Sequence, residues 1–229
     1  MTIDAGDDIA NAGLGRQVRT LEARMLFLPR DPNSDVVTLD QETLTWLTEV
    51  TRVLEGRRRF WFNRERATSN ALVRYDVQGE GFWTRYLALY RHGGIEVGAD
   101  HVTYHTRDVR FFSLRSLVGL AWIAANVQFK ATDRWQIQTP FELTLALRTT
   151  TNAALGDFAE GWSDPEWIDE TPTSLEDNVL LRFELEDGID VEECVTDLGD
   201  RVEQAFGSVS RRHIARVGEY EGRLDPRGR

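Results

Sequence analysis

Residues 71–97 read ALVRYDVQGEGFWTRYLALYRHGGIEV, and this stretch decides the fold class. Its first eight residues alternate between apolar and polar side chains, a period of two that is typical of a strand with one face on a core. Gly79-Glu80-Gly81 then turns the chain into a second strand, and Arg91-His92-Gly93-Gly94 turns it into a third. Glycine accepts the positive φ that tight hairpin turns require. The stretch therefore predicts an antiparallel meander over residues 70–105.

The segments outside the meander include both helical and strand patterns. A helical face predicts a helix over residues 40–55, and a nearly continuous apolar run predicts a central buried helix over residues 111–129. Residues 141–147 and 179–185 again alternate with a period of two, which indicates two further strands. A capping pattern at Asp190 begins a C-terminal helix that ends before Gly207. Because strands and helices do not alternate regularly, we expect an α+β fold with a mainly antiparallel sheet packed against the two later helices.

This pattern divides the chain into three parts. Residues 1–37 form a peripheral N-terminal segment, in which Leu26-Phe27-Leu28 is an apolar anchor that leads into a proline-containing loop. Residues 38–207 form a single α+β domain. Residues 208–229 form a basic tail.

Charge and composition exclude several classes of function. The chain has 229 residues and a formal net charge of −11, which argues against a general polyanion binder. The charge is uneven, since residues 52–115 carry 12 basic and 7 acidic groups and residues 157–203 carry 2 basic and 17 acidic groups. Its one cysteine, Cys194, cannot form an internal disulfide, and no secretory signal or membrane span is recognisable. We therefore expect a cytoplasmic protein without membrane partners.

The first candidate site is the segment of residues 56–66, in which arginines and aromatic residues interleave. Arginines can follow a phosphate backbone while aromatic rings stack on unpaired bases. The alternative is a structural segment whose rings pack inward and whose arginines meet the acidic part of the chain. The residues that would contact single-stranded nucleic acid are Arg57, Arg58, Arg59, Trp61, Arg64 and Arg66.

The second candidate site contains His101, His105 and Asp108. On a strand, side chains four residues apart lie roughly 13 Å from each other, which is too far for both to bind one metal ion. Thr103 and Tyr104 favour such an extended structure. The sequence therefore predicts neither a metal site nor a cofactor, and hydrolase-like chemistry at these residues is an alternative to surface histidines.

The third candidate site is the acidic segment of residues 157–170, which is long for a connection between two strands. An exposed tryptophan can anchor a protein partner, and carboxylates can steer a basic one. The alternative is a solvated loop whose tryptophans cover the edge of the sheet. The residues that would bind the partner are Trp162, Asp164, Glu166, Trp167 and Asp169.

One resemblance to a known family rests on two motifs. Residues 86–97, YLALYRHGGIEV, and residues 135–143, WQIQTPFEL, flank the apolar helix. With that helix, they resemble the C-terminal regions of bacterial Schlafen-like, Alba-type DNA-binding proteins over about residues 60–207. The chain has no counterpart of that family's separate N-terminal Alba-like domain, to which nucleic-acid binding is ascribed. The resemblance therefore implies an accessory or interaction role, and it carries over no catalytic residue.

Together these patterns favour a non-catalytic binding or regulatory module that acts through a protein partner or through self-association. It could be an accessory component of a larger complex. Single-stranded nucleic-acid binding through the Arg-aromatic segment is one alternative. A hydrolase-like enzyme built on the histidine pair is the other.

Overall fold

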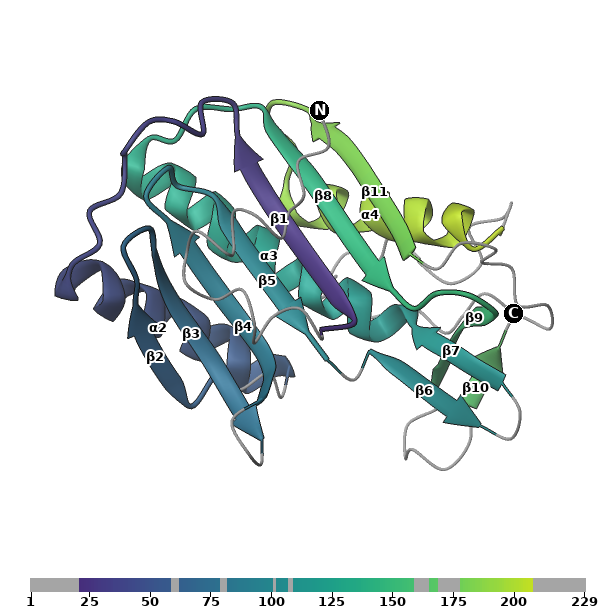
Figure 1. The fold of residues 1–229 in the computed structure, drawn as a ribbon. Helices are drawn as coiled ribbons and strands as arrows, with labels where there is room; N and C mark the ends of the chain where they lie inside the picture. Colours follow the sequence, from purple (N-terminus) through teal and green to yellow (C-terminus); the bar gives the residue numbers. More distant parts are fainter. Residues whose placement is uncertain are drawn as a thin grey trace.

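The computed structural model describes residues 21–58, 62–78, 82–100, 102–106, 109–158, 165–168 and 178–207. These residues form a large antiparallel sheet of seven strands, a smaller sheet of four strands and three helices (Figure 1). The predicted α+β class with a mainly antiparallel sheet is confirmed. The basic tail of residues 208–229 lies outside the described residues.

The large sheet has the strand order β11-β8-β1-β5-β4-β3-β2, and each neighbouring pair is antiparallel. Strands β3, β4 and β5 form the predicted meander, in which Gly93 adopts a φ of +84° at the turn. The bounds of the seven strands are β1 Ala23–Pro29, β2 Arg64–Ala67, β3 Ala71–Gln78, β4 Phe82–Tyr90, β5 Ile95–Ala99, β8 Phe141–Arg148 and β11 Asn178–Leu185.

The smaller sheet has the order β10-β9-β7-β6 and lies beside one end of the large sheet (Figure 1). Its strands β7 and β9 run parallel, and the other two pairs are antiparallel. The bounds of its strands are β6 Thr103–Thr106, β7 Val109–Ser113, β9 Ala153–Phe158 and β10 Pro165–Ile168.

The three helices cover one face of the large sheet, which is the rear face in Figure 1. They are α2 Gln41–Arg58, α3 Leu114–Trp135 and α4 Val191–Ala205. Residues of α3 and α4 share one hydrophobic core with the alternate side chains of β1, β5, β8 and β11. We refer to the opposite side of the sheet, against which no described helix packs, as its open face, although its central residues are also buried. The sequence also predicts that a central buried helix and a C-terminal helix pack against the sheet, and these helices are α3 and α4.

The predicted N-terminal boundary is wrong, because β1 lies in the middle of the large sheet. Met25 and Phe27 face the helices, whereas Leu26 belongs to a second cluster on the open face. A strand that is buried on both faces reads as a continuous apolar run without alternation. From the sequence alone, the apolar run at residues 26–28 therefore cannot be told apart from a short anchor at the edge of the domain.

The bounds of the central helix also differ from the prediction. Residues 109–113 form β7, so Phe111 and Phe112 are buried strand residues. Ser113 caps the helix by accepting a hydrogen bond from the backbone N–H of Ser116 at 3.1 Å. The helix then continues to Trp135, where Gln136 adopts a left-handed conformation. The N-cap at Asp190 is confirmed, since its carboxylate accepts the backbone N–H of Glu193 at 2.8 Å.

Candidate functional site

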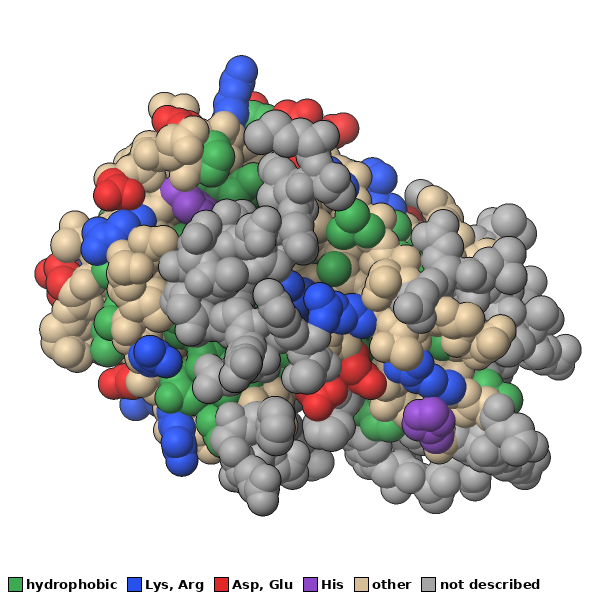
Figure 2. All heavy atoms as spheres, viewed as in Figure 1, with side chains coloured by type: hydrophobic (Ala, Val, Ile, Leu, Met, Phe, Trp, Pro, Cys, Tyr) green, Lys and Arg blue, Asp and Glu red, His purple; other side chains and the backbone are tan. Residues whose placement is uncertain are grey.

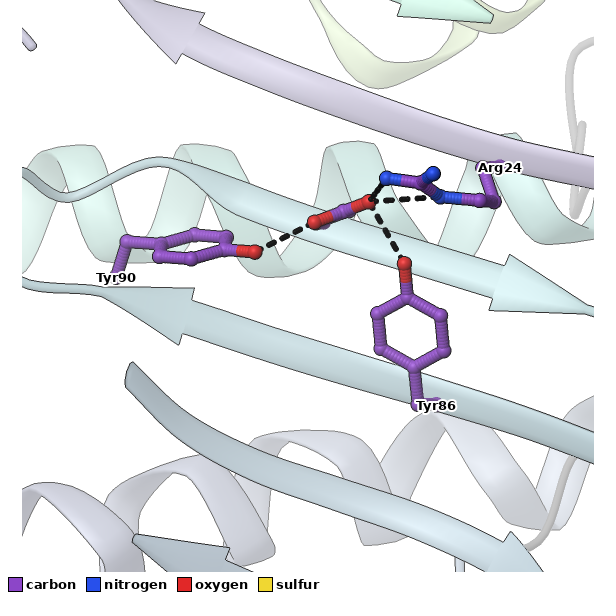
Figure 3. Close-up of polar contacts among 4 residues, drawn as sticks. Arg24, Tyr86 and Tyr90 are labelled. Atoms are coloured by element: carbon purple, nitrogen blue, oxygen red, sulfur yellow. Dashed lines mark hydrogen bonds and ion pairs between the residues drawn. The ribbon is translucent and has the colours of Figure 1, made fainter. Parts of the chain in front are cut away.

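A buried polar cluster inside the sheet joins Arg24 on β1, Glu96 on β5, and Tyr86 and Tyr90 on β4 (Figure 3). Arg24 donates to Oε1 of Glu96 through Nε at 3.1 Å and through Nη2 at 2.6 Å. The Tyr86 hydroxyl donates to the same oxygen at 2.7 Å, and the Tyr90 hydroxyl donates to Oε2 at 2.5 Å. We call these four residues the Glu96 cluster. It connects three adjacent strands at the centre of the sheet.

The Glu96 cluster is closed to solvent. Its four residues are between 0% and 6% exposed, and burial raises the pKa of the Glu96 carboxyl although Arg24 and the two hydroxyls oppose that shift. Burial, together with the charge of Glu96, also raises the pKa of Tyr86 and of Tyr90. Both phenols therefore stay protonated and serve as donors to the carboxylate. A group that no substrate can reach stabilises the sheet rather than catalysing a reaction.

A small pocket lies between the C-terminal end of α3 and the turn that leads into α4. Its volume is about 270 Å³, and its lining combines apolar side chains with threonines and two exposed carboxylates. No histidine, cysteine or lysine is among the lining residues. The pocket therefore offers no nucleophile paired with a base. The lining residues are Phe129, Thr132, Asp133, Thr139, Pro140, Phe141, Leu185, Glu186, Gly188 and Ile189.

The predicted histidine site is described only in part. His105 lies exposed on β6, opposite Arg110 of β7, whereas His101 and Asp108 lie outside the described residues. Within the described ranges, no group of three or more His, Cys, Asp or Glu side chains could hold a metal ion. The hydrolase-like alternative therefore gains no geometric support from the residues that are described.

The Arg-aromatic segment is divided between two elements. Arg57 and Arg58 end α2, and Arg64 and Arg66 are exposed on β2. Arg59 and Trp61 lie outside the described residues. Phe62 is buried in the core, and the guanidinium carbon of Arg74 lies 5.5 Å from the centre of its ring. The ring of Phe62 is therefore a packing residue and not a surface on which a base stacks.

The acidic tryptophan segment is not entirely a loop. Residues 165–168 form β10 and pair with β9, which itself extends to Phe158. Glu166 and Trp167 therefore lie on a strand, whereas Trp162, Asp164 and Asp169 lie outside the described residues. The prediction that these residues bind a partner stays a prediction.

The two edges of the large sheet differ in a way that the sequence does not reveal. Strand β2 is four residues long, fully exposed and mostly charged, with the sequence RERA. Short, charged edge strands resist pairing with another chain. Strand β11, at the other edge, is eight residues long, pairs with β8 in an unbroken register and contains no proline. Its Leu180 is 59% exposed, and a long, regular edge strand of this kind is a template for another strand.

The hydrogen bonds of the sheet show which backbone groups of β11 have no partner among the described strands. The backbone N–H of Arg148 donates to the carbonyl of Glu22 at 2.9 Å, so the even-numbered residues of β8 direct their backbone groups toward β1. The odd-numbered residues of β8 consequently bond to the odd-numbered residues of β11, such as Leu143 to Phe183. Leu180, Arg182 and Glu184 therefore direct their N–H and C=O groups toward the outer edge. We call this row of groups the β11 edge.

The open face of the sheet carries charges of both signs. Figure 2 views this face, and blue and red side chains are interspersed over its described part without an extended basic stripe. On β8 and β11, Arg182 pairs with Glu142 at 3.0 Å, and Glu184 stands directly opposite Glu142 in the register. An extended nucleic-acid strand has no continuous basic path across the described residues of this face.

Comparisons with known proteins identify no relative. No family model, no curated protein and no solved structure matches the chain. The resemblance to Schlafen-like proteins therefore stays a prediction. In the part of the chain that the structure describes, no helix is long and apolar enough to cross a membrane. Cys194 is buried in α4, and burial raises the pKa of its thiol to about 12, so the group is not a reactive nucleophile.

Proposed function

We propose that this chain is a non-catalytic protein-interaction module that binds an extended protein segment along the β11 edge. The observation that carries this proposal is the contrast between the two edge strands. β2 has four residues, three of them charged, whereas β11 has eight residues in an unbroken register, five of them apolar. In strand addition, backbone hydrogen bonds supply affinity and alternate side chains supply specificity. The β11 edge offers for this purpose the backbone groups of Leu180, Arg182 and Glu184, which no described strand pairs with.

The chemistry of the interior supports a role in binding. The Glu96 cluster is buried, the Cys194 thiol is held protonated, and the pocket near α3 combines only apolar, hydroxyl and carboxylate groups. As part of the same proposal, we place the protein in the cytoplasm, where a single buried cysteine is expected to stay reduced.

A photo-crosslinking residue at position 184 should form an adduct with a protein chain when the protein is expressed in cells. The matched control carries the same residue at Glu65, a glutamate on the opposite edge strand, and should form none. Adducts from position 65 alone, or adducts with nucleic acid alone, would contradict the proposal. Mass spectrometry of the adduct identifies the bound segment.

Leu180→Pro should weaken this binding about tenfold, because proline lacks the N–H that residue 180 directs to the edge. The fold should persist, since the ladder between β8 and β11 uses the odd-numbered residues. Leu180→Ala retains the N–H and serves as the matched control. The yield of adduct from position 184, together with the unfolding midpoint, checks both variants. Equal yields from the two variants would show that the backbone of β11 is not the binding element.

Single-stranded nucleic-acid binding is the second candidate, because Arg64 and Arg66 are exposed on the same strand. If it operates, Arg64→Ala with Arg66→Ala should weaken binding of a labelled oligonucleotide at low salt. The double variant should leave the adduct from position 184 unchanged.

A further inference from the structure

We infer that the segment bound at the β11 edge is β11 of a second copy of this chain, so that two large sheets join into one across a two-fold axis. This inference rests on the proposed function and names the partner. A two-fold interface brings the same surface of both subunits together, so the surface must complement itself. The sequence of β11 meets that requirement.

The self-complementary segment is Leu181-Arg182-Phe183-Glu184-Leu185. When two such strands run antiparallel about an axis at Phe183, Arg182 stands opposite Glu184 of the partner subunit. The reciprocal pair forms at the same time. Opposite charges at directly opposing positions stabilise an antiparallel pair, and like charges destabilise it. This register therefore places both charged pairs favourably.

Neighbouring registers with the same backbone pairing lack this complementarity. An axis at Arg182 places that residue opposite its own copy, and an axis at Glu184 places the two glutamates opposite each other. Both arrangements set like charges against each other. The registers that keep the backbone hydrogen bonds differ from one another by moving the two-fold axis along the strand by one residue. Among the three axes compared, the one at Phe183 is favoured, because it alone sets opposite charges against each other.

The backbone geometry is compatible with the same axis. Arg182 and Glu184 direct their N–H and C=O groups to the β11 edge, so they form hydrogen-bonded pairs across it. Phe183 bonds to β8 and therefore forms a non-hydrogen-bonded pair with Phe183 of the partner subunit. Side chains approach most closely at such pairs. The Arg201 guanidinium lies 4.1 Å from the centre of the Phe183 ring, which fixes the ring beside α4.

The charges within one subunit leave a specific deficit that the second copy supplies. Glu142 and Glu184 stand directly opposite each other on β8 and β11, and Arg182 pairs with Glu142 at 3.0 Å. Among the described residues, Glu184 has no ion pair. In the dimer, Arg182 of the partner subunit would stand next to Glu184. Its positive charge would offset the repulsion between the carboxylates of Glu184 and Glu142. The partner subunit would therefore supply the cation that Glu184 lacks within its own subunit.

The test measures the molar mass of the purified full chain by sedimentation at several concentrations. We expect a concentration-dependent dimer, and we expect Glu184→Arg to weaken it about tenfold or more, because both opposing pairs become Arg–Arg. Arg182→Glu should weaken it similarly by creating two Glu–Glu pairs. The control Glu65→Arg introduces the same charge change on β2 and should leave the dimer unchanged.

A mixture of the two single variants separates specific pairing from misfolding. The Arg182→Glu chain presents only glutamates at the two positions, and the Glu184→Arg chain presents only arginines, so the mixture should form a heterodimer. The double variant, Arg182→Glu with Glu184→Arg, restores both opposing pairs and should dimerise as the unchanged chain does. Neither recovery is expected if the single variants merely damage the fold.

Two outcomes would overturn the inference. The first is a chain that is monomeric at every concentration, and the second is a dimer that Glu184→Arg does not affect. If the chain is monomeric but position 184 still forms an adduct with a different protein, the inference fails and the proposed function stands. If position 184 forms no protein adduct and the chain is monomeric, both fail.

Discussion

Arg24→Met is expected to lower the free energy of unfolding by about 3–5 kcal/mol at pH 8, because it leaves the Glu96 carboxylate buried without its cation. The Glu96 cluster holds three adjacent strands together, so the loss affects the whole sheet. Arg85→Met is the matched control, since Arg85 and Asp76 form a partly exposed pair at 3.6 Å. Such a pair contributes about 0–1 kcal/mol. Chemical denaturation of both variants measures the difference.

The loss in Arg24→Met should shrink as the pH falls. Burial raises the pKa of Glu96 in the folded state above its ordinary value of 4.5, and removal of Arg24 raises it further. The folded state then binds a proton at a higher pH than the unfolded chain, so stability rises as the pH falls through the folded pKa and stops rising near 4.5. A deficit that is the same at pH 8 and pH 5 would contradict this account of the cluster.

Gln128→Leu is expected to cost about 2–4 kcal/mol, because it removes two hydrogen bonds from fully buried backbone groups. The Gln128 amide donates to the carbonyl of Gly93 at 3.0 Å, and its carbonyl accepts the N–H of Ile95 at 2.9 Å. These bonds tie α3 to the hairpin turn between β4 and β5. Leucine fills similar space but satisfies neither group.

Gln204→Leu provides the control for this variant, since Gln204 is an exposed residue of α4. It should change the free energy of unfolding by about 0.5 kcal/mol or less. Hydrogen exchange at the amide of Ile95 should also accelerate in Gln128→Leu and not in Gln204→Leu. Equal stabilities of the two variants would show that water replaces the lost partner at the turn.

The parts of the fold that follow a periodic pattern could be predicted from the sequence. Strands β8 and β11 place their alternating apolar side chains in the core beside the helices, and their predicted bounds nearly equal the observed ones. Strand β1 could not be found in this way, because both of its faces are buried. The sequence predicts a helix from residue 111, which lies within β7, because a short apolar strand and a buried helical segment share the same composition.

The sites depend on contacts that no local pattern contains. Arg24 and Glu96 are 72 positions apart, and they meet only because β1 inserts next to β5. Gln128 lies on an apolar helix, where a single polar residue gives no sign of its partners. The free edge of β11 is likewise a property of strand order. The alternation of residues 179–185 predicts a strand, but it cannot say whether that strand is central or terminal.

The central position of β1 has a consequence for folding during synthesis. Ala23 pairs with Ala99 on one side and with Leu147 on the other, so β1 leaves the ribosome before the two strands with which it pairs. At about 5–20 residues per second, the wait for β8 lasts roughly 6–25 s. Pairing across such sequence distances is slow and exposes the chain to aggregation. Arg24 is the one charged residue of β1, and a charge within an apolar segment lowers its tendency to aggregate while the segment is exposed.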